Sequence, residues 1–364
     1  MEKTKRLYFV DAVRAFAILM MLQGHFIDTL LNPIYKTNTS VAFNVWSYFR
    51  GITAPTFFTI SGLVFAYLLL RSYSKGSDIQ RIKKGLFRGV LLIFTGYLLR
   101  INFLSWLNGD FNSSFLVVDV LQCIGLSLIL LVVLHLLFRT HSYVFSIVLF
   151  AIGFLCFLTE PLYRTLSLDH MPVLFSNYLS KSNGSVFTML PWFGYSAFGA
   201  FTATVFYRHL HKAKFKLYTV LAFLGLGYLF LYQSSWFLNK IYAITDIQLF
   251  YDSAHYNYLF TRFGNVLFLF GIFYGLERFL KASFITKIGQ KTLSIYIIHF
   301  ILLYGSFTGF GLKRYLDKSL DPVQAIFGAL CFILLVCVLS FYYARTNAFL
   351  YSTFKLLIDK LKRN

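Results

Sequence analysis

Apolar residues recur along the chain in runs of about 20, separated by short polar stretches. A run of this length spans a hydrocarbon core of roughly 30 Å when it is helical. Barrel strands would instead alternate apolar and polar residues over about 10 positions. The pattern therefore predicts an all-α polytopic membrane protein with about ten transmembrane helices. The predicted spans are residues 7–31, 46–70, 85–105, 115–138, 143–159, 187–207, 217–233, 257–279, 292–310 and 322–344.

The overall composition supports a membrane protein. The chain has 364 residues, of which 58% are hydrophobic and 13% charged, and its mean hydropathy of +0.66 exceeds what the surface of a water-soluble domain carries. No polar insertion approaches domain size, so residues 1–364 are predicted to form a single transmembrane domain. Its longest outer loops, 160–186 and 234–256, are rich in Phe, Tyr and Leu and are expected at the membrane surface. Residues 346–364 are predicted to form an interfacial amphipathic helix.

The positive charges indicate how the chain is oriented. With ten spans both termini lie on one side, and about two thirds of the 34 lysines and arginines flank the spans on that side. The positive-inside rule therefore places both termini in the cytoplasm. The same basic clusters, such as 81–88 and 208–216, account for the net charge of +20 without nucleic acid, because they lie next to anionic headgroups. A phosphate-bearing ligand is the alternative partner of these clusters.

The first span, FVDAVRAFAILMMLQGHF (9–26), carries groups that hydrocarbon penalises. Arg14 and His25 are eleven positions apart, which places them on one helix face with about 16 Å between them along the axis. Asp11 lies near this stripe and is predicted to pair with Arg14. His25 lies toward the outer leaflet, and Gly24 leaves room there for another group. The alternative is that Asp11 and Arg14 extend to the headgroups and His25 is a packed core residue.

Other polar residues are predicted one or two turns below the outer surface. Asp119 and Gln122 are three positions apart and share a helix face, and so do Arg262 and Asn265. Asp119 is suited to orient His25 or a sugar hydroxyl, and its alternative role is a salt bridge to Arg100 or Arg262. The candidate substrate-binding residues are Arg50, Asp119, Gln122, Arg262 and Asn265. The four cysteines fall within spans and match no metal or disulfide motif, so no metal is expected.

Several of these segments resemble a known family. Arg14 and His25, with ten residues between them in DAVRAFAILMMLQGHF, resemble the first-helix motif of the transmembrane acyltransferases. That superfamily joins the acyltransferase-3 proteins with the heparan-alpha-glucosaminide N-acetyltransferase type. The segment RGITAPTFFTISGLVFA (50–66) is similar to the second helix of bacterial members of the latter branch. Later landmarks of similar kind are DVLQCIGLSLILL (119–131), LPWFGYSAFGA (190–200) and LSIYIIHF (293–300).

The resemblance implies an acyl-CoA-dependent acyltransferase, either an O- or an N-acetyltransferase. Such an enzyme moves an acyl group, usually acetyl, from cytoplasmic acetyl-CoA to a hydroxyl or amine of a glycan or lipid-linked sugar on the outer side. His25 would be the catalytic general base, since an imidazole ordinarily titrates near neutrality. A covalent acyl-histidine stays an alternative. The implied location is a bacterial inner (cytoplasmic) membrane, and self-association into a homo-oligomer is left open.

The resemblance also implies a CoA site at the cytoplasmic ends of the helices. Acyltransferase-3 proteins tend to show two arginines three apart at the start of the third helix, whereas this chain has Lys84 and Arg88, four apart. Lysine binds phosphate as a point charge but lacks the two-pronged geometry of arginine. His299 is expected to line the acyl-CoA entrance, and a hydrogen-bonded core histidine is its alternative. The residues assigned to acetyl-CoA are Arg14, Lys84, Arg88 and His299.

Two other functions are compatible with the same residues. A transporter or flippase for a sugar, lipid or small anion would line its path with intramembrane charges. A relative without catalytic activity would serve as a membrane partner, although the retention of both Arg14 and His25 argues against it. The expected partners are acyl-CoA, a carbohydrate or glycolipid acceptor and membrane lipids.

Overall fold

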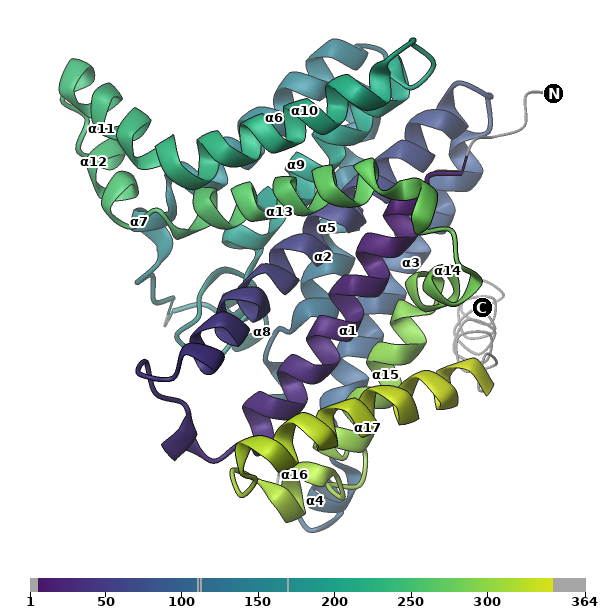
Figure 1. Cartoon of the computed structure of the whole chain (residues 1–364), viewed down its shortest axis with the longest axis vertical. Helices are drawn as coiled ribbons and strands as arrows, with labels where there is room; N and C mark the ends of the chain where they lie inside the picture. Colours follow the sequence, from purple (N-terminus) through teal and green to yellow (C-terminus); the bar gives the residue numbers. More distant parts are fainter. Residues whose placement is uncertain (1–5, 110, 112, 169, 343–364) are drawn as a thin grey trace. The chain divides into compact units, whose positions relative to one another are not determined.

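The computed structural model describes residues 6–109, 111, 113–168 and 170–342 (Figure 1). Within these ranges the regular structure is helical, and β pairing is confined to two isolated bridges. The predicted all-α class is therefore confirmed. The interfacial helix expected at 346–364 lies outside the described residues.

A long helical segment covers most of each predicted span. The helices concerned are α1 (Tyr8–Leu30), α2 (Val41–Tyr73), α3 (Asp78–Arg100), α5 (Val120–Phe138), α6 (Ser142–Leu158), α9 (Met189–His209), α10 (Phe215–Tyr228), α13 (Tyr258–Gly275), α15 (Thr292–Tyr304) and α17 (Pro322–Tyr342). Six segments within the described ranges are long and apolar enough to cross a membrane, namely α1, α2, α5, α13, α17 and the continuous run Phe215–Thr245 that begins with α10. The helices α6 and α15 are apolar but shorter.

Shorter helices occupy the connections. They are α4 (Phe103–Leu107), α7 (Glu160–Tyr163), α8 (Val173–Leu179), α11 (Ser234–Thr245), α12 (Gln248–His255), α14 (Ser283–Gln290) and α16 (Leu312–Leu316). A π-helical turn, η3 (Leu229–Gln233), joins α10 to α11 without a break. The 3₁₀ turns are η1 (Pro33–Tyr35), η2 (Ser113–Leu116) and η4 (Glu277–Phe279). The two segments predicted as long outer loops thus contain α7 and α8, and α11 and α12.

Helix ends differ from the ends of the hydrophobic runs for local reasons. The third predicted span continues to 105, but α3 ends at Arg100, and Asn102 then caps α4 by accepting a hydrogen bond from the backbone N–H of Ser105. Similarly, α5 starts five residues after the predicted boundary because Asp119 is its N-cap. The ninth span is shorter than predicted, since Gly305, with φ of +72°, ends α15.

The chain divides into two compact units. Among the described residues, the first unit comprises 6–13, 54–97 and 116–281, and the second comprises 14–53, 98–115 and 282–342. The core of the first unit is aromatic: the rings of Phe157 and Phe263 contact each other, and each also contacts the rings of Tyr195 and Phe198. Such contacts fix the packing of α6, α9 and α13 in a protein where aromatic residues make up 20% of the chain.

In the first unit, α2 and α9 approach until their backbones touch. A Cβ atom on Gly62 would lie 2.0 Å from the carbonyl oxygen of Ser196. A Cβ atom on Gly199 would lie 1.9 Å from the carbonyl oxygen of Thr59. Both contacts are closer than any side chain permits, so this crossing requires glycine on both helices.

The second unit contains most of α1 together with α15 and α17 (Figure 1). Phe26 of α1 packs on Phe332 of α17, with ring centroids 5.2 Å apart. The segments after α1 and before α17 are also paired, because Asn32 N–H donates to the carbonyl of Leu320 and Leu320 N–H donates to the carbonyl of Leu30. These contacts hold the C-terminal half of α1 in a defined place, and that half carries His25.

Candidate functional site

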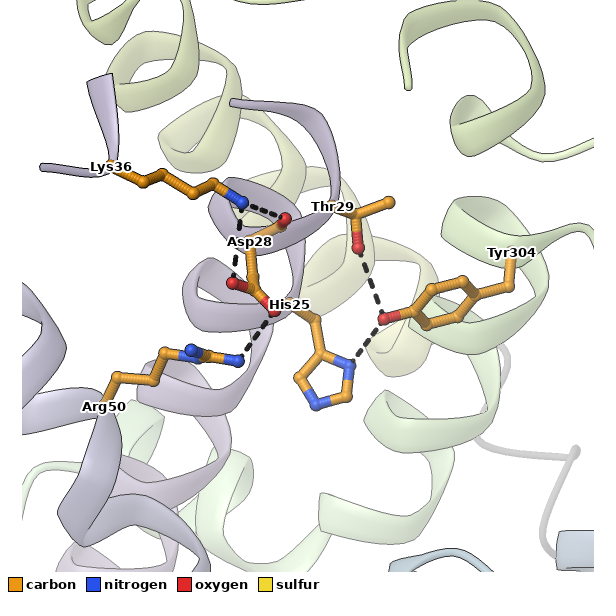
Figure 2. Close-up of polar contacts among 6 residues, drawn as sticks. All are labelled: His25, Asp28, Thr29, Lys36, Arg50 and Tyr304. Atoms are coloured by element: carbon orange, nitrogen blue, oxygen red, sulfur yellow. Dashed lines mark hydrogen bonds and ion pairs between the residues drawn. The ribbon is translucent and has the colours of Figure 1, made fainter. Parts of the chain in front are cut away.

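His25 lies on α1, where its half-buried side chain meets α15 (Figure 2). Its Nδ1 atom is 2.9 Å from the hydroxyl oxygen of Tyr304. The same tyrosine oxygen is 3.4 Å from the hydroxyl of Thr29, one turn further along α1. The imidazole is therefore held through one ring nitrogen by a chain of two hydroxyl groups.

A second histidine lies beside the first. The rings of His25 and His299 are 5.3 Å apart between centroids and meet edge to face at 86°. His299 is fully buried and also contacts the rings of Tyr296 and Phe300. His299 is thus a neighbour of His25 in the described structure. The role predicted for it at the acyl-CoA entrance is not tested by this contact and stays a prediction.

Arg14 connects the beginnings of two helices. Its Nη2 atom donates to the hydroxyl of Thr292, the first residue of α15, at 2.9 Å. Because Arg14 contacts the start of α15 and His25 contacts its end, the two helices run parallel along this stripe. The N-terminus of α15 carries partial positive charge from its backbone N–H groups, and Lys291 immediately precedes it. The result is a concentration of positive charge at this end of the second unit.

Asp11 has a basic partner that sequence spacing did not suggest. The Asp11 carboxylate accepts two hydrogen bonds from Arg6, at 2.6 Å from Nη2 and 3.1 Å from Nε. Arg6 also lies over the ring of Tyr8. Asp11 is thereby compensated at the start of α1, and its pairing with Arg14 stays a prediction.

A cluster of charges surrounds the C-terminal turn of α1, next to His25 (Figure 2). Asp28 Oδ2 accepts a hydrogen bond from Arg50 Nη2 at 2.7 Å, and Lys36 Nζ donates to the Asp28 carbonyl at 2.6 Å. The Arg50–Asp28 pair is about two-fifths exposed on both sides, so it adds little stability. The pair instead holds Arg50 in place, with the aliphatic part of its side chain over Gly24. The small residue before His25 thus leaves room for a neighbouring side chain.

The first part of α2 is fixed to α1 in the second unit. Trp46 Nε1 donates to Gln23 Oε1 at 2.6 Å, two residues before His25. The Arg50 guanidinium lies 5.5 Å from the centre of the Trp46 ring. The predicted substrate residue Arg50 is therefore placed beside the predicted catalytic histidine.

The remaining candidates belong to the first unit. Asp119 and Gln122 form a capping box at the start of α5, in which the Asp119 N–H donates to Gln122 Oε1 at 3.2 Å and Gln122 is fully buried. On α13, the Asn265 amide donates to the Thr261 carbonyl, and Arg262 lies over the Tyr258 ring. These contacts give the four candidates a structural setting, and their substrate roles stay predictions.

Lys84 and Arg88 lie one turn apart on α3, and both are exposed. They share a helix face as their spacing predicted. They belong to the first unit, with Asp11 and the α5 and α13 candidates, whereas Arg14, His25, Arg50 and His299 belong to the second.

Two residues of the site are not predictable from the sequence pattern. Thr292 and Tyr304 are separated by 278 and 279 residues from their partners Arg14 and His25. A threonine and a tyrosine in an apolar helix carry no distinctive signal, because tyrosine is common near a membrane surface whatever its role and a single threonine matches no motif. Only the packing of α1 against α15 identifies them.

The comparison with protein families identifies a family for the N-terminal two thirds of the chain. The sequence model described as heparan-alpha-glucosaminide N-acetyltransferase, catalytic, matches residues 6–235, which include α1 with Arg14 and His25. Among curated proteins none matches the chain. The family match spans well over half of the 364 residues. The chain therefore belongs to the heparan-alpha-glucosaminide N-acetyltransferase catalytic family, a family of membrane acetyltransferases.

Proposed function

We propose that this protein transfers an acetyl group from cytoplasmic acetyl-CoA to a hydroxyl or amine of a glycan or lipid-linked sugar on the outer side of the membrane. His25 acts as the general base on the acceptor. The observation that carries this assignment is the 2.9 Å contact between His25 Nδ1 and the Tyr304 hydroxyl. His25 lies on α1, which is within the family match. An intramembrane histidine held by a specific partner is typical of a functional site.

The hydroxyl chain supports one tautomer of His25. When Nδ1 carries the proton, it donates to the Tyr304 oxygen, and the Tyr304 hydroxyl in turn donates to Thr29 Oγ1. The lone pair then lies on Nε2, the atom that takes the proton from the attacking hydroxyl or amine. As the new bond to the acetyl carbon forms, the thioester C–S bond breaks, and the proton leaves with CoA as its thiol. As positive charge develops on the ring, the Nδ1–H to Tyr304 hydrogen bond becomes charge-assisted and stronger. The tyrosine thereby contributes more in the transition state than in the ground state.

The residues at the start of α15 fit the anionic end of CoA. Arg14, Lys291 and the helix N-terminus concentrate positive charge where phosphate groups bind readily. About 16 Å of α1 separates Arg14 from His25, a length suited to an extended thioester-bearing arm. Lys84 and Arg88 on α3 are proposed as additional phosphate contacts. Acetyl-CoA supplies the activated thioester, and the polypeptide supplies position and the base.

The charged cluster at the outer end of α1 supports an acceptor site. Arg50 and Lys36 offer hydrogen-bond donors, and the Asp28 carboxylate offers acceptors, next to His25. Such a mixture matches the hydroxyl and amine groups of a sugar. The residues Asp119, Gln122, Arg262 and Asn265 complete the proposed acceptor contacts. We also propose ten transmembrane helices in one domain, with both termini cytoplasmic in a bacterial inner membrane.

The proposed function is tested with the purified full-length protein in proteoliposomes. We expect acetyl-CoA to bind and its labelled acetyl group to appear on an α-glucosaminide supplied on the opposite side. The Arg14→Ala variant should bind acetyl-CoA about tenfold more weakly, because it loses a charged hydrogen-bond donor. Calorimetric titration measures the affinity, and radiolabel transfer measures the activity.

Two controls separate the roles of Arg14. Arg314→Ala removes an exposed arginine of α16 in the same unit and should leave the affinity unchanged. Thr292→Val removes the helix contact of Arg14 but keeps the cation, so it should bind acetyl-CoA nearly normally. If no CoA ester binds and a solute crosses the vesicle membrane, the enzyme hypothesis is wrong and the transporter hypothesis takes its place. Normal affinity and stability of Arg14→Ala would remove that residue from the donor site.

Tyr304→Phe is expected to reduce kcat about 10- to 100-fold with little change in KM for either substrate. The variant keeps the ring and its packing but loses the hydroxyl that pairs with His25 Nδ1, and a hydrogen bond to a charged partner contributes about 1.5–3 kcal/mol. Steady-state kinetics over a range of pH measures the effect. Tyr315→Phe, at an exposed position on α16, is the matched control. A Tyr304→Phe enzyme with normal kcat and an unchanged pH profile would contradict the positioning role.

A further inference from the structure

A hydrophobic groove lies in the first unit, and none of the residues proposed for acetyl transfer lines it. Its volume is about 430 Å³, within the usual range for small-molecule sites. The walls come from α6, α9, α10, α13 and the π-helical turn η3, and consist mainly of phenylalanine and aliphatic side chains. Representative wall residues are Phe150, Phe201, Phe206, Phe223, Phe230 and Phe263.

The groove opens among side chains that hydrocarbon surrounds in a membrane. Phe150, Tyr218 and Leu226 line it and are each at least 43% exposed. Helices with exposed apolar faces of this kind contact lipid chains directly. An occupant therefore enters from the bilayer, and a nucleotide or free sugar meets only the hydroxyl groups of Thr202, Tyr218 and Thr219 along these walls.

One end of the groove is basic. His209, the last residue of α9, and Lys212 in the connection to α10 line it there. The Nδ1 atom of His209 is buried and has no hydrogen-bond partner among the described residues. Lys212 is exposed. These two groups are placed to meet an anion at the end of the apolar walls.

Neighbouring basic residues have other contacts. Arg208 donates to the Ser142 carbonyl and lies over the Tyr143 ring. Lys216 lies 3.8 Å from the Glu277 carboxylate. Among the basic residues of this region, Lys212 and His209 line the groove, so an anionic occupant meets the Lys212 ammonium and the His209 imidazole.

We infer that the groove binds one acyl chain of an anionic phospholipid, whose phosphate contacts Lys212 and His209. The apolar walls suit the acyl chain of the lipid. The basic end of the groove lies where α9 ends, and a helix end at the membrane surface is at the level of the lipid headgroups. A zwitterionic phospholipid such as phosphatidylcholine also satisfies the walls and carries a phosphate, but its quaternary ammonium removes the net negative charge that favours the basic end. The groove is distinct from the proposed acetyl-transfer site, since none of its lining residues is proposed to bind acetyl-CoA or the acceptor.

The test uses native mass spectrometry of the full-length protein with dioleoyl phosphatidylglycerol and dioleoyl phosphatidylcholine at equal concentrations. The two lipids have the same chains and differ in net charge. We expect the anionic lipid to be retained about fivefold more than the neutral one. Lys212→Ala should abolish this preference, while Lys287→Ala, which removes an exposed lysine of α14, should preserve it.

A second pair of variants tests the groove itself. Ala222→Phe fills the groove and should lose the retained phospholipid, whereas Leu221→Phe adds bulk at the neighbouring exposed position, outside the lining, and should keep it. Ala213→Leu provides a second filling variant if Ala222→Phe fails to fold. Equal retention of both lipids by the unaltered protein, or full retention by a folded groove-filling variant, would overturn the inference. Displacement of the lipid by inorganic phosphate alone would also overturn it.

Discussion

Replacing His25 by alanine is expected to lower acetyl transfer by about 100- to 10,000-fold, the usual loss when a positioned general base is removed. This corresponds to about 3–5 kcal/mol of transition-state stabilisation. The affinity for acetyl-CoA should change little, because the proposed phosphate contacts lie about 16 Å away along α1. Single-turnover transfer of labelled acetyl measures the first quantity, and calorimetric titration measures the second.

The control for this variant is His211→Ala, at an exposed histidine beyond the end of α9. It should transfer acetyl at the normal rate. Because His25 also packs on His299, its loss carries some structural cost, so the thermal stability of both variants is measured alongside. Added imidazole should restore part of the rate of His25→Ala, which a purely structural role would not explain. Unchanged turnover of His25→Ala would remove the residue from the mechanism.

The second large effect is expected at the crossing of α2 and α9. Gly199→Ala places a methyl group where the Thr59 carbonyl oxygen lies 1.9 Å away. The obstacle is backbone on a neighbouring helix, so no rotamer change relieves it and the helices must separate. We expect a loss of about 3 kcal/mol or more of stability, at the upper end for overpacking. The melting temperature, measured by differential scanning fluorimetry in detergent, should fall by at least about 5 °C.

Two comparisons support or contradict this explanation. Gly62→Ala meets the Ser196 carbonyl at 2.0 Å and should be similarly destabilised. Gly225→Ala, on α10, has no atom within 4 Å of the added methyl group and should be neutral or slightly stabilising, since alanine favours helix. Equal melting temperatures for Gly199→Ala and Gly225→Ala would show that the helices do not pack as described.

Features of the fold that depend on neighbouring residues are predictable from the sequence, whereas features that depend on distant residues are not. Helical class and the positions of the long helices depend on runs of apolar residues, which are local properties. Helix ends depend on single residues, so the cap at Asp119 and the left-handed Gly305 displaced the predicted boundaries. The apolar segments predicted as outer loops became α11 and α12, because short helices satisfy backbone hydrogen bonds near a membrane surface.

The candidate site shows the same division. Spacing on one helix placed Arg14 and His25 on a common face, and the small residue Gly24 indicated room for a neighbour. It did not indicate that Arg6 would be a partner of Asp11, since both residues lie at the start of a helix where several basic groups compete. Nor did it indicate that His299 and His25 would be neighbours, because their distance depends on how α1 and α15 cross.

By itself, the sequence determined that this protein is helical, membrane-embedded and a member of an acetyltransferase family, and it identified one stripe of ionisable residues on the first helix. Hydrophobic periodicity and motif spacing are properties of neighbouring residues, so they can be identified from the sequence. Only the tertiary structure decided that Tyr304 holds His25 and that Thr292 holds Arg14. In the sequence, each partner is separated from its residue on α1 by nearly 280 positions. The pattern of residues along one helix does not indicate which face of a distant helix it will contact.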